Sequence, residues 1–309
     1  MHVRNRVSPF LRAAGVALFG LLASGPAPSS AEETLVQKVE SLYNDIYLYR
    51  RDDGYYYLTF GAQRLHYVES IVNPKDLLEL PVTYTHYMTL AVAYTKTLTD
   101  AAMIGLGGGR TSWYLHKSIP DLNFAAAELD SAIVEIDKKY FGVKDEPNFQ
   151  VNTQDGRIFL TRSDRSFDVI LVDAYRGPFV PFHLLTTEFF ALAKKHLKDG
   201  GALVQNVEPS TMLFDSAVAT ISKVFGNLDF YRGDGNIVIV AYDGPRKSPE
   251  ELKEAAAQRQ AKYNFRYDLT KLLDAQFQPK IDTAAKPLTD DFAPAEYLRA
   301  IQRYNVKQN

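Results

Sequence analysis

The chain has 309 residues, of which 46% are hydrophobic, and its 35 basic and 37 acidic side chains leave a formal net charge of −2. This composition is that of a globular protein with an apolar core, which excludes a disordered tail, a coiled coil and a collagen-like fibre; the near-zero charge argues against nucleic acid as a partner. The absence of cysteine excludes disulfides, thiolate nucleophiles and cysteine-ligated metals, and the six histidines show no helix-spaced metal pair, so we expect no metal site.

The N-terminus has the pattern of a secretory signal peptide. Three arginines within the first twelve residues precede an apolar run over residues 13–23, and small residues occupy positions 29–31. The run is shorter than the about 20 residues that span a bilayer, and no second apolar stretch of that length follows. We therefore predict cleavage after Ala31, a periplasmic or secreted protein and no membrane span after cleavage. An uncleaved N-terminal anchor is the alternative.

The next segment is rich in aromatic residues and predicts a small antiparallel sheet. Residues 34–46 are expected to form a short helix that leads into the first strand. Aromatic, β-prone runs flank Asp52-Asp53-Gly54 and indicate a hairpin over residues 47–60. Arg64–Val72 supplies a third strand, which Asn73-Pro74 ends.

From residue 99 onward, apolar strands alternate with amphipathic helices, which indicates a parallel sheet with helices on both faces. The expected strands are Ala101–Gly105, Asn123–Glu128, Asn148–Asn152, Phe167–Ala174 and Ala202–Val207, followed by an antiparallel pair, Asn227–Arg232 and Asn236–Tyr242. The expected helices include Ser131–Tyr140, Thr186–Leu197 and Pro249–Lys262. The fold class is therefore α/β: a small antiparallel sheet domain (32–98), a Rossmann-like, mostly parallel sheet with an antiparallel end pair (99–245) and a C-terminal helical extension (246–309).

A glycine-rich loop follows the first of these parallel strands. Gly105, Gly107 and Gly109 are spaced G-x-G-x-G, and Arg110 stands where the dinucleotide-binding pattern G-x-G-x-x-G has its last glycine. Glycine lets the backbone turn tightly and approach a bound nucleotide, although such loops also serve as plain strand–helix turns.

Four carboxylates stand at the ends of neighbouring strands. Glu128 and Asp130 end the second strand, Asp155 follows the third and Asp173 ends the fourth. The carboxyl ends of parallel strands form the crevice where open α/β sheets bind ligands, and a carboxylate there accepts hydrogen bonds from ribose hydroxyls. Each residue is also a candidate helix N-cap. Four in succession beside a glycine loop predict a site for a nucleoside-type cofactor.

Taken together, these motifs resemble the spermidine-synthase family, the aminopropyltransferases built on the class I AdoMet-dependent methyltransferase fold. The resemblance covers nearly all of residues 47–299, and its last segment looks like the tail of the bacterial, exported branch. The segments that carry it are Tyr57–Gly61, Leu80–Tyr84, the glycine loop, Ala127–Asp130, Gln154–Leu160, Phe167–Asp173 and Pro287–Pro294.

The resemblance implies S-adenosylmethionine or decarboxylated S-adenosylmethionine as co-substrate, a small-molecule acceptor and a homodimer. It places Glu128 on the ribose, Asp155 on the adenine amino group and Asp173 on the arm near the sulfonium. The implied cofactor-binding residues are Gly105, Gly107, Gly109, Arg110, Glu128, Asp130, Asp155, Gly156 and Asp173. The implied catalytic residues are Asp173, Tyr175 and Arg176, and the implied substrate-binding residues are Arg64, Tyr84, His86, Asp290 and Asp291.

The sequence departs from the family pattern where a polyamine would be handled. Arg110 replaces the acid of G-G-G-D, Arg176 replaces the second acid of D-x-x-D, Arg64 replaces a glutamine and His86 replaces a glutamate. Two like charges ~4 Å apart repel by about 4 kcal/mol at an effective dielectric constant of ~20, so Arg110 and Arg176 disfavour a cationic amine. Arginine instead clamps carboxylates and phosphates.

One hypothesis is that Arg110 pairs with the carboxylate of intact S-adenosylmethionine, and another is that Arg176 binds an anionic acceptor. The alternative is that both arginines point into solvent or pair with acidic neighbours. Three functions follow: aminopropyl transfer to an amine, methyl or aminocarboxypropyl transfer to an anionic acceptor, and a non-catalytic nucleoside-binding protein. Export favours the third, because sulfonium donors are made in the cytoplasm.

Overall fold

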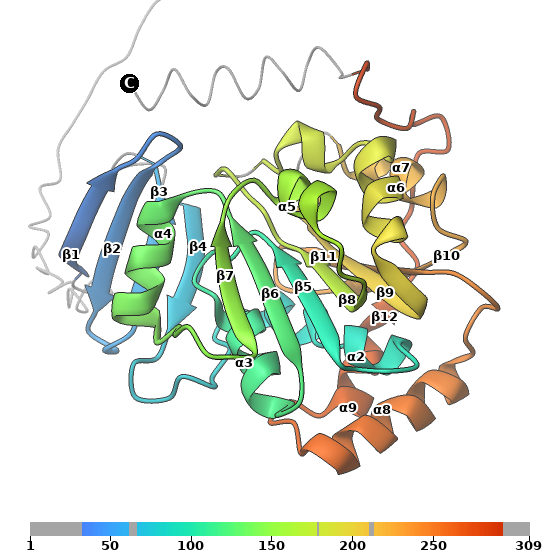
Figure 1. Ribbon diagram of the computed structural model, residues 1–309, viewed down its shortest axis with the longest axis horizontal. Coiled ribbons are helices and arrows are strands. Elements are labelled where there is room, and N and C mark those ends of the chain that lie inside the picture. Colours follow the sequence, from blue (N-terminus) through green and yellow to red (C-terminus); the bar gives the residue numbers. More distant parts are fainter. Residues whose placement is uncertain (1–32, 62–66, 178, 210–212, 293–309) are drawn as a thin grey trace, which may run out of the picture. The chain divides into compact units, whose positions relative to one another are not determined.

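The computed structural model describes residues 33–61, 67–177, 179–209 and 213–292. The expected signal peptide and Arg64 lie outside these ranges. The chain from Glu33 onward forms one compact unit, whose described residues build a four-stranded sheet and an eight-stranded sheet (Figure 1).

The small sheet is antiparallel, with its strands adjacent in chain order. Its strands are β1 (Glu33–Glu40), β2 (Asp45–Arg51), β3 (Tyr56–Phe60) and β4 (Tyr67–Val72). The expected hairpin is confirmed, since β2 and β3 pair across a turn in which Gly54 has φ 85°.

The expected helix over residues 34–46 is wrong, because most of this segment is the edge strand β1. Pairing with β2 from Glu33↔Arg51 to Glu40↔Asp45 satisfies the backbone of β1. Most side chains of β1 are exposed, so a helix here would have no apolar face to bury.

The larger sheet has the strand order β12-β10-β11-β9-β8-β5-β6-β7. Its strands are β5 (Asp100–Ile104), β6 (Asn123–Glu128), β7 (Phe149–Thr153), β8 (Phe167–Val172), β9 (Leu197–Val207), β10 (Asn227–Arg232), β11 (Ile237–Tyr242) and β12 (Gln276–Phe277). The five strands from β7 to β9 are parallel, whereas β11 runs antiparallel to both β9 and β10. The expected parallel sheet with an antiparallel end pair is therefore confirmed, and β12 adds an unexpected edge strand on β10.

Alternate side chains of the central parallel strands enter two separate apolar cores. On β5, Ala101 and Met103 join one core, and Ala102 and Ile104 join the other, as the period of two in a strand dictates. The first core is covered by α1 (Thr83–Met88), α2 (Ala91–Tyr94), α3 (Arg110–Ser118), α8 (Pro249–Tyr263), α9 (Leu269–Leu272) and the 3₁₀ turn η3 (Leu273–Ala275). The second is covered by α5 (Gly156–Arg162), the 3₁₀ turn η2 (Phe182–Leu184), α6 (Thr187–Lys195) and α7 (Phe214–Ser222).

A third apolar cluster joins the small sheet to the helical segment that follows β6. The expected helix Ser131–Tyr140 is α4 (Ser131–Ile136) followed by the π-helical turn η1 (Asp137–Phe141). Ile133, Ile136 and Phe141 pack against Ile46, Leu48 and neighbouring side chains of the small sheet. This packing brings β4 to the carboxyl ends of β5, β6 and β8. In the described part of the chain, we find no helix that is long and apolar enough to cross a membrane.

Candidate functional site

A cavity of about 350 Å³ is lined by residues at the carboxyl ends of β5, β6 and β8 and by residues of the small sheet and of α1. The residues expected from the sequence that line this cavity are Tyr84, Gly105, Gly107, Arg110, Glu128, Asp130, Asp155, Gly156, Asp173, Tyr175 and Arg176. The fold thus brings together in one cavity side chains that are up to about a third of the chain apart in sequence.

The glycine loop is shaped by contact with the end of β8. Gly105 has φ 83°, and a Cβ there would stand 2.5 Å from the carbonyl oxygen of Asp173. No other residue type fits this position without displacing backbone. Gly107, with φ 55°, lines the cavity, whereas Gly109 caps α3 with φ 63° behind the cavity wall and faces Val143. Gly108 also lines the cavity, so Gly109 is the one glycine of the loop that does not belong to the described lining.

Glu128 holds the glycine loop in place. Its Oε2 accepts a hydrogen bond from the amide of Leu106 at 2.8 Å, and its Oε1 accepts one from the amide of Asp130 at 3.0 Å. Burial raises the pKa of this half-buried carboxyl above its usual value. Each carboxylate oxygen has a second lone pair, so Glu128 retains the capacity to accept a ligand hydroxyl.

Asp130 and Asp155 are both helix N-caps and cavity-lining residues. Asp130 Oδ1 accepts from the amide of Ala132 at 3.0 Å at the start of α4. Asp155 Oδ1 accepts from the amides of Arg157 and Ile158 at 2.9 and 3.0 Å at the start of α5. Each of these two aspartates therefore caps a helix and lines the cavity at the same time.

The second oxygen of Asp155 meets a histidine of the loop that follows β8. His183 Nε2 lies 2.7 Å from Asp155 Oδ2. Burial acts to raise the pKa of Asp155, but hydrogen bonds from His183 and the α5 amides bring it below its usual value. Gly156 packs closely against Ile104, since a Cβ at position 156 would approach Ile104 Cγ2 to 2.1 Å.

Asp173 is the centre of a hydrogen-bond network that joins three elements. Tyr84 of α1 donates its hydroxyl to Asp173 Oδ2 at 3.0 Å, and Asn206 of β9 donates its amide to Asp173 Oδ1 at 2.8 Å. Tyr175 donates its hydroxyl to the Asn206 carbonyl at 3.1 Å. Burial raises the pKa of Asp173 to about 6, so this carboxyl exchanges a proton just below neutral pH.

Glu69 is a cavity-lining residue that the sequence reasoning missed. It lies on β4, where Leu58 pairs with Ser70 and Thr59 pairs with Val68, so that Glu69 is the extra residue of a β-bulge. Its Oε1 is buried without a hydrogen-bond partner in the described part of the chain. Burial, then repulsion from Asp173 and Glu208, raises the pKa of Glu69 well above its usual value.

Arg110 does not have the environment expected of a carboxylate clamp or of a surface arginine. The residue is 4% exposed, and its terminal nitrogens donate to the backbone carbonyls of Phe141 and Leu77. Burial lowers the pKa of Arg110 to about 10, so it stays charged at neutral pH. Arg110 therefore holds the backbone at Leu77 and at Phe141 beside the glycine loop. Arg176, in contrast, is exposed at the cavity rim.

Three residues expected to bind substrate lie outside the cavity among the residues that the structure describes. His86 stacks on Tyr267 with ring centroids 3.9 Å apart, and its Nε2 lies 2.6 Å from the carbonyl oxygen of Leu80. Asp290 forms a two-bond ion pair with Arg157 at 2.7 and 2.6 Å. Asp291 is exposed. These three residues are therefore not among the described residues that line the cavity, and their contact with substrate stays a prediction.

Sequence comparisons find that this chain is similar to polyamine aminopropyltransferases and, over a shorter stretch, to a methyltransferase homolog. A model of the spermine/spermidine synthase domain matches residues 89–232. The polyamine aminopropyltransferase of Vibrio vulnificus is 29% identical over 299 residues, a match that covers 92% of this chain and 98% of that protein. An eEF1A lysine and N-terminal methyltransferase homolog of Drosophila pseudoobscura is 28% identical over 190 residues, covering 55% of this chain and 28% of that protein.

The fold is also found among solved structures. Spermidine synthase from Thermotoga maritima superposes with a TM-score of 0.64 at 20% identity, covering 80% of this chain and 84% of that one. At this identity, the superposition shows a common fold.

Proposed function

Because this chain is homologous to polyamine aminopropyltransferases and has the fold of spermidine synthases, we propose that it transfers an aminopropyl group from decarboxylated S-adenosylmethionine to an amine. The observation that carries the proposal is the charge of the cavity beside Asp173. Glu69 and Asp173 line this end, whereas Arg110 of the same cavity donates its terminal nitrogens to backbone carbonyls and Arg176 is exposed at the rim. An acidic cavity suits both a sulfonium donor and an amine.

The nucleoside end of the cavity supports the same donor. Gly105 and Gly107 let the backbone approach the nucleoside, and Glu128 keeps lone pairs for its ribose. Asp155, at the adjacent strand end, is suited to accept from the adenine amino group through the free lone pair of Oδ2.

The reaction requires an uncharged amine nitrogen that attacks the methylene carbon bonded to sulfur. A C–N bond forms, the C–S bond breaks with its electron pair moving to sulfur, and methylthioadenosine leaves as a neutral thioether. In this proposal Asp173, which its pKa of about 6 leaves ionised at neutral pH, takes the proton that the ammonium form of the amine must lose before it attacks. Tyr84 and Asn206 fix the orientation of this carboxylate.

Methyl transfer from intact S-adenosylmethionine is the second candidate, and similarity to the Drosophila methyltransferase homolog favours it. Intact S-adenosylmethionine carries a carboxylate, which needs a cation near the sulfonium arm. Arg110, the residue expected to supply that cation, donates both terminal nitrogens to carbonyls. This arrangement favours the decarboxylated donor.

Product analysis by mass spectrometry tests the proposal. The purified full chain is incubated with decarboxylated S-adenosylmethionine and 1,4-diaminobutane, and separately with intact S-adenosylmethionine. We expect methylthioadenosine and an aminopropylated amine in equal amounts from the first mixture. S-adenosylhomocysteine from the second mixture alone indicates methyl transfer, and binding of both donors without any product indicates a non-catalytic nucleoside-binding protein.

We also propose that the protein is exported and that residues 1–31 are removed. The support is the basic, apolar and small-residue pattern of this segment. Fractionation of the producing cells, with N-terminal sequencing of the protein, tests this proposal. We expect a periplasmic or secreted protein that begins at Glu32; a cytoplasmic protein that retains residues 1–31 contradicts the proposal.

A further inference from the structure

We propose that the acceptor is an amine whose other end carries an oxyanion, a carboxylate or a phosphate, and that Arg176 binds this oxyanion at the rim of the cavity. The inference rests on the proposed aminopropyl transfer and adds to it the chemical class of the acceptor.

The backbone places Arg176 at the rim, three residues after Asp173 and just beyond the end of β8, and both residues line the cavity. The amide of Arg176 donates to the carbonyl oxygen of Phe179 at 2.8 Å, and the amide of Phe179 donates to the carbonyl oxygen of Arg176 at 3.4 Å. Gly177, with φ 57°, allows the chain to turn between them. The paired backbone therefore fixes where the side chain of Arg176 begins, while the residue itself is exposed.

The two arginines that line the cavity differ in their partners. Arg110 is buried, and its terminal nitrogens donate to the carbonyl oxygens of Leu77 and Phe141. Within the described ranges, the guanidinium of Arg176 has neither a hydrogen-bond partner nor an ion-pair partner. A guanidinium presents its N–H donors in a planar fork that matches the two oxygens of a carboxylate or a phosphate. Arg176 is thus available to an oxyanion, whereas Arg110 is not.

The charges of the cavity differ between its interior and its rim. Asp173 and Glu69 are half-buried acids of the lining, and Arg176 is an exposed base. An acceptor that places its amine beside Asp173 and its other end toward solvent meets Arg176 with that end. A second ammonium there is repelled, an apolar end gains nothing, and an oxyanion forms charge-assisted hydrogen bonds.

The bond changes of the proposed transfer are the same with such an acceptor. With 4-aminobutanoate, a C–N bond forms at the methylene carbon bonded to sulfur, and the C–S bond breaks with its electron pair moving to sulfur. The products are N-(3-aminopropyl)-4-aminobutanoate and methylthioadenosine, and Asp173 takes the proton that the ammonium of the acceptor loses before attack. The oxyanion takes no part in these changes, so we expect Arg176 to act on KM rather than on kcat.

The test compares kcat/KM for 4-aminobutanoate, 3-aminopropylphosphonate, 1-aminobutane and 1,4-diaminobutane, with decarboxylated S-adenosylmethionine as donor. For an amine with an oxyanion, we expect a value about 10-fold above that for 1-aminobutane, between the effects of exposed ion pairs and of hydrogen bonds between charged groups. 1,4-Diaminobutane stays a substrate, with a lower kcat/KM than the preferred oxyanion probe. The larger of the values for the two oxyanion probes identifies the anion as a carboxylate or a phosphate.

Variants of Arg176 separate oxyanion binding from a general effect on the site. Arg176→Gln should lose the preference through a raised KM and leave kcat/KM for 1-aminobutane unchanged. Arg176→Lys should keep part of the preference, because lysine retains the charge without the planar fork. Arg162→Gln is the matched control, since it changes an exposed arginine of α5 outside the described lining and should keep the preference. The wild-type preference should also shrink at about 1 M salt, because salt screens exposed ion pairs.

Equal kcat/KM values for all four amines, or a preference that persists in Arg176→Gln, overturns the inference. The carboxylate of intact S-adenosylmethionine is the other anion within this chemistry. If Arg176→Gln weakens binding of intact S-adenosylmethionine in calorimetry and keeps the affinity for the decarboxylated donor, Arg176 binds the donor and the inference is overturned. A wild-type chain that binds methylthioadenosine but uses none of the four amines overturns the proposed function itself.

Discussion

Asp173 and Glu69 show how two acidic side chains of one cavity acquire different properties from their surroundings. Asp173 is fixed by Tyr84 and Asn206, and burial raises its pKa to about 6. Glu69 keeps a buried oxygen without a partner in the described chain, and its pKa is raised further. Arg176 occupies the position of the second acid of D-x-x-D, and Glu69 brings a second carboxyl to the cavity from another element.

Replacing Asp173 with asparagine should remove the proton acceptor without altering the shape of the site. We expect kcat to fall by about 10²- to 10⁴-fold. In the wild type, kcat/KM should rise as the pH increases through about 6, because Asp173 must be ionised to take the proton. This rise of kcat/KM through pH 6 should be absent from the pH profile of Asp173→Asn.

The matched control is Asp164→Asn, which changes an exposed acid outside the cavity and should keep both the rate and the rise of kcat/KM through pH 6. If kcat/KM of Asp173→Asn still rises through pH 6 as in the wild type, another group controls the proton transfer.

Gly105→Ala tests the contact between the glycine loop and β8. A methyl group at this position would stand 2.5 Å from the Asp173 carbonyl oxygen, in addition to the strain of an alanine at φ 83°. Gly54→Ala at φ 85° is the control, because it carries the same backbone strain with nothing within 4 Å. Gly54→Ala should cost about 1–2 kcal/mol in urea unfolding and leave methylthioadenosine binding unchanged.

Gly105→Ala should lower stability more than the control and weaken methylthioadenosine binding in calorimetry. Equal stability losses in the two variants, with ligand affinity kept, would contradict the close approach of the loop to β8.

Some site residues could be predicted from the sequence because their positions follow from local rules. Asp130, Asp155 and Asp173 lie at or just after strand ends, and apolar runs mark those ends. Glu69 could not be predicted in this way, since its direction depends on a bulge that appears only when β3 and β4 pair. The partners of Arg110 are backbone carbonyls of distant residues, which no local pattern reveals.

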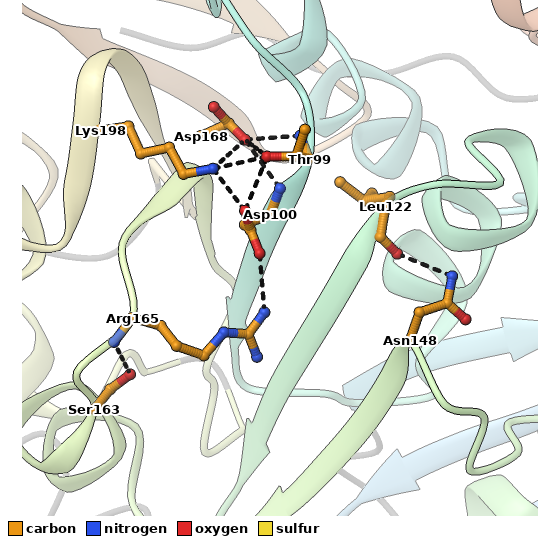
Figure 2. Close-up of polar contacts among 8 residues, drawn as sticks. All are labelled: Thr99, Asp100, Leu122, Asn148, Ser163, Arg165, Asp168 and Lys198. Carbon is orange, nitrogen blue, oxygen red and sulfur yellow. Dashed lines mark hydrogen bonds and ion pairs between the residues drawn. The ribbon is translucent and has the colours of Figure 1, made fainter.

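At the scale of elements, a polar network ties β5 and β8 together at the end of the sheet opposite the cavity (Figure 2). The buried carboxylate of Asp168 accepts from the amides of Thr99 and Asp100 at 2.8 and 2.9 Å, and from Lys198 Nζ at 3.1 Å. Lys198 and Arg165 also contact Asp100 at 2.6 and 3.3 Å. The network satisfies the first amides of β5 where the strand begins.

This network makes stability depend on pH. Burial acts to raise the pKa of Asp168, but its hydrogen bonds lower it to about 2. A carboxyl whose folded pKa lies below the unfolded value of about 3.9 stabilises the fold above pH 4. This contribution is lost as the pH falls from 4 toward 2.

Asp168→Asn should therefore lower the free energy of unfolding by about 1–3 kcal/mol at pH 7, as measured in urea. The difference from the wild type should shrink toward pH 3. Asp199→Asn is the control: it removes an exposed partner of Lys96 and should change stability little at either pH. A difference that stays constant between pH 7 and pH 3 would contradict the role of the ionised Asp168.

The elements that were predicted correctly are those with a strong period or a continuous apolar run. The central parallel strands are buried on both faces, as in β8, where every residue is buried, whereas the edge strand β7 is partly exposed. Two elements were missed because tertiary pairing alone creates them. β1 is an exposed edge that exists through β2, and the two residues of β12 are a strand only because β10 lies beside them.

At the scale of the whole molecule, the cavity needs both sheets. The larger sheet supplies the glycine loop and the strand-end carboxylates, and the small sheet supplies Glu69. Ile133, Ile136 and Phe141 fasten the small sheet to the helical segment that follows β6. The overall charge of −2 says little about function, because the charge that matters is local: Glu69 and Asp173 line the cavity, Arg176 lies exposed at its rim and Arg110 is buried against carbonyls.

The measurement that tests this account most directly is a competition between donors. The purified full chain is given equal concentrations of decarboxylated and intact S-adenosylmethionine with 1,4-diaminobutane, and the amine products are identified by mass spectrometry. The account predicts that the amine product carries an aminopropyl group, with methylthioadenosine formed in equal amount. An amine that carries a methyl or aminocarboxypropyl group, or a mixture in which neither donor is consumed, would contradict it.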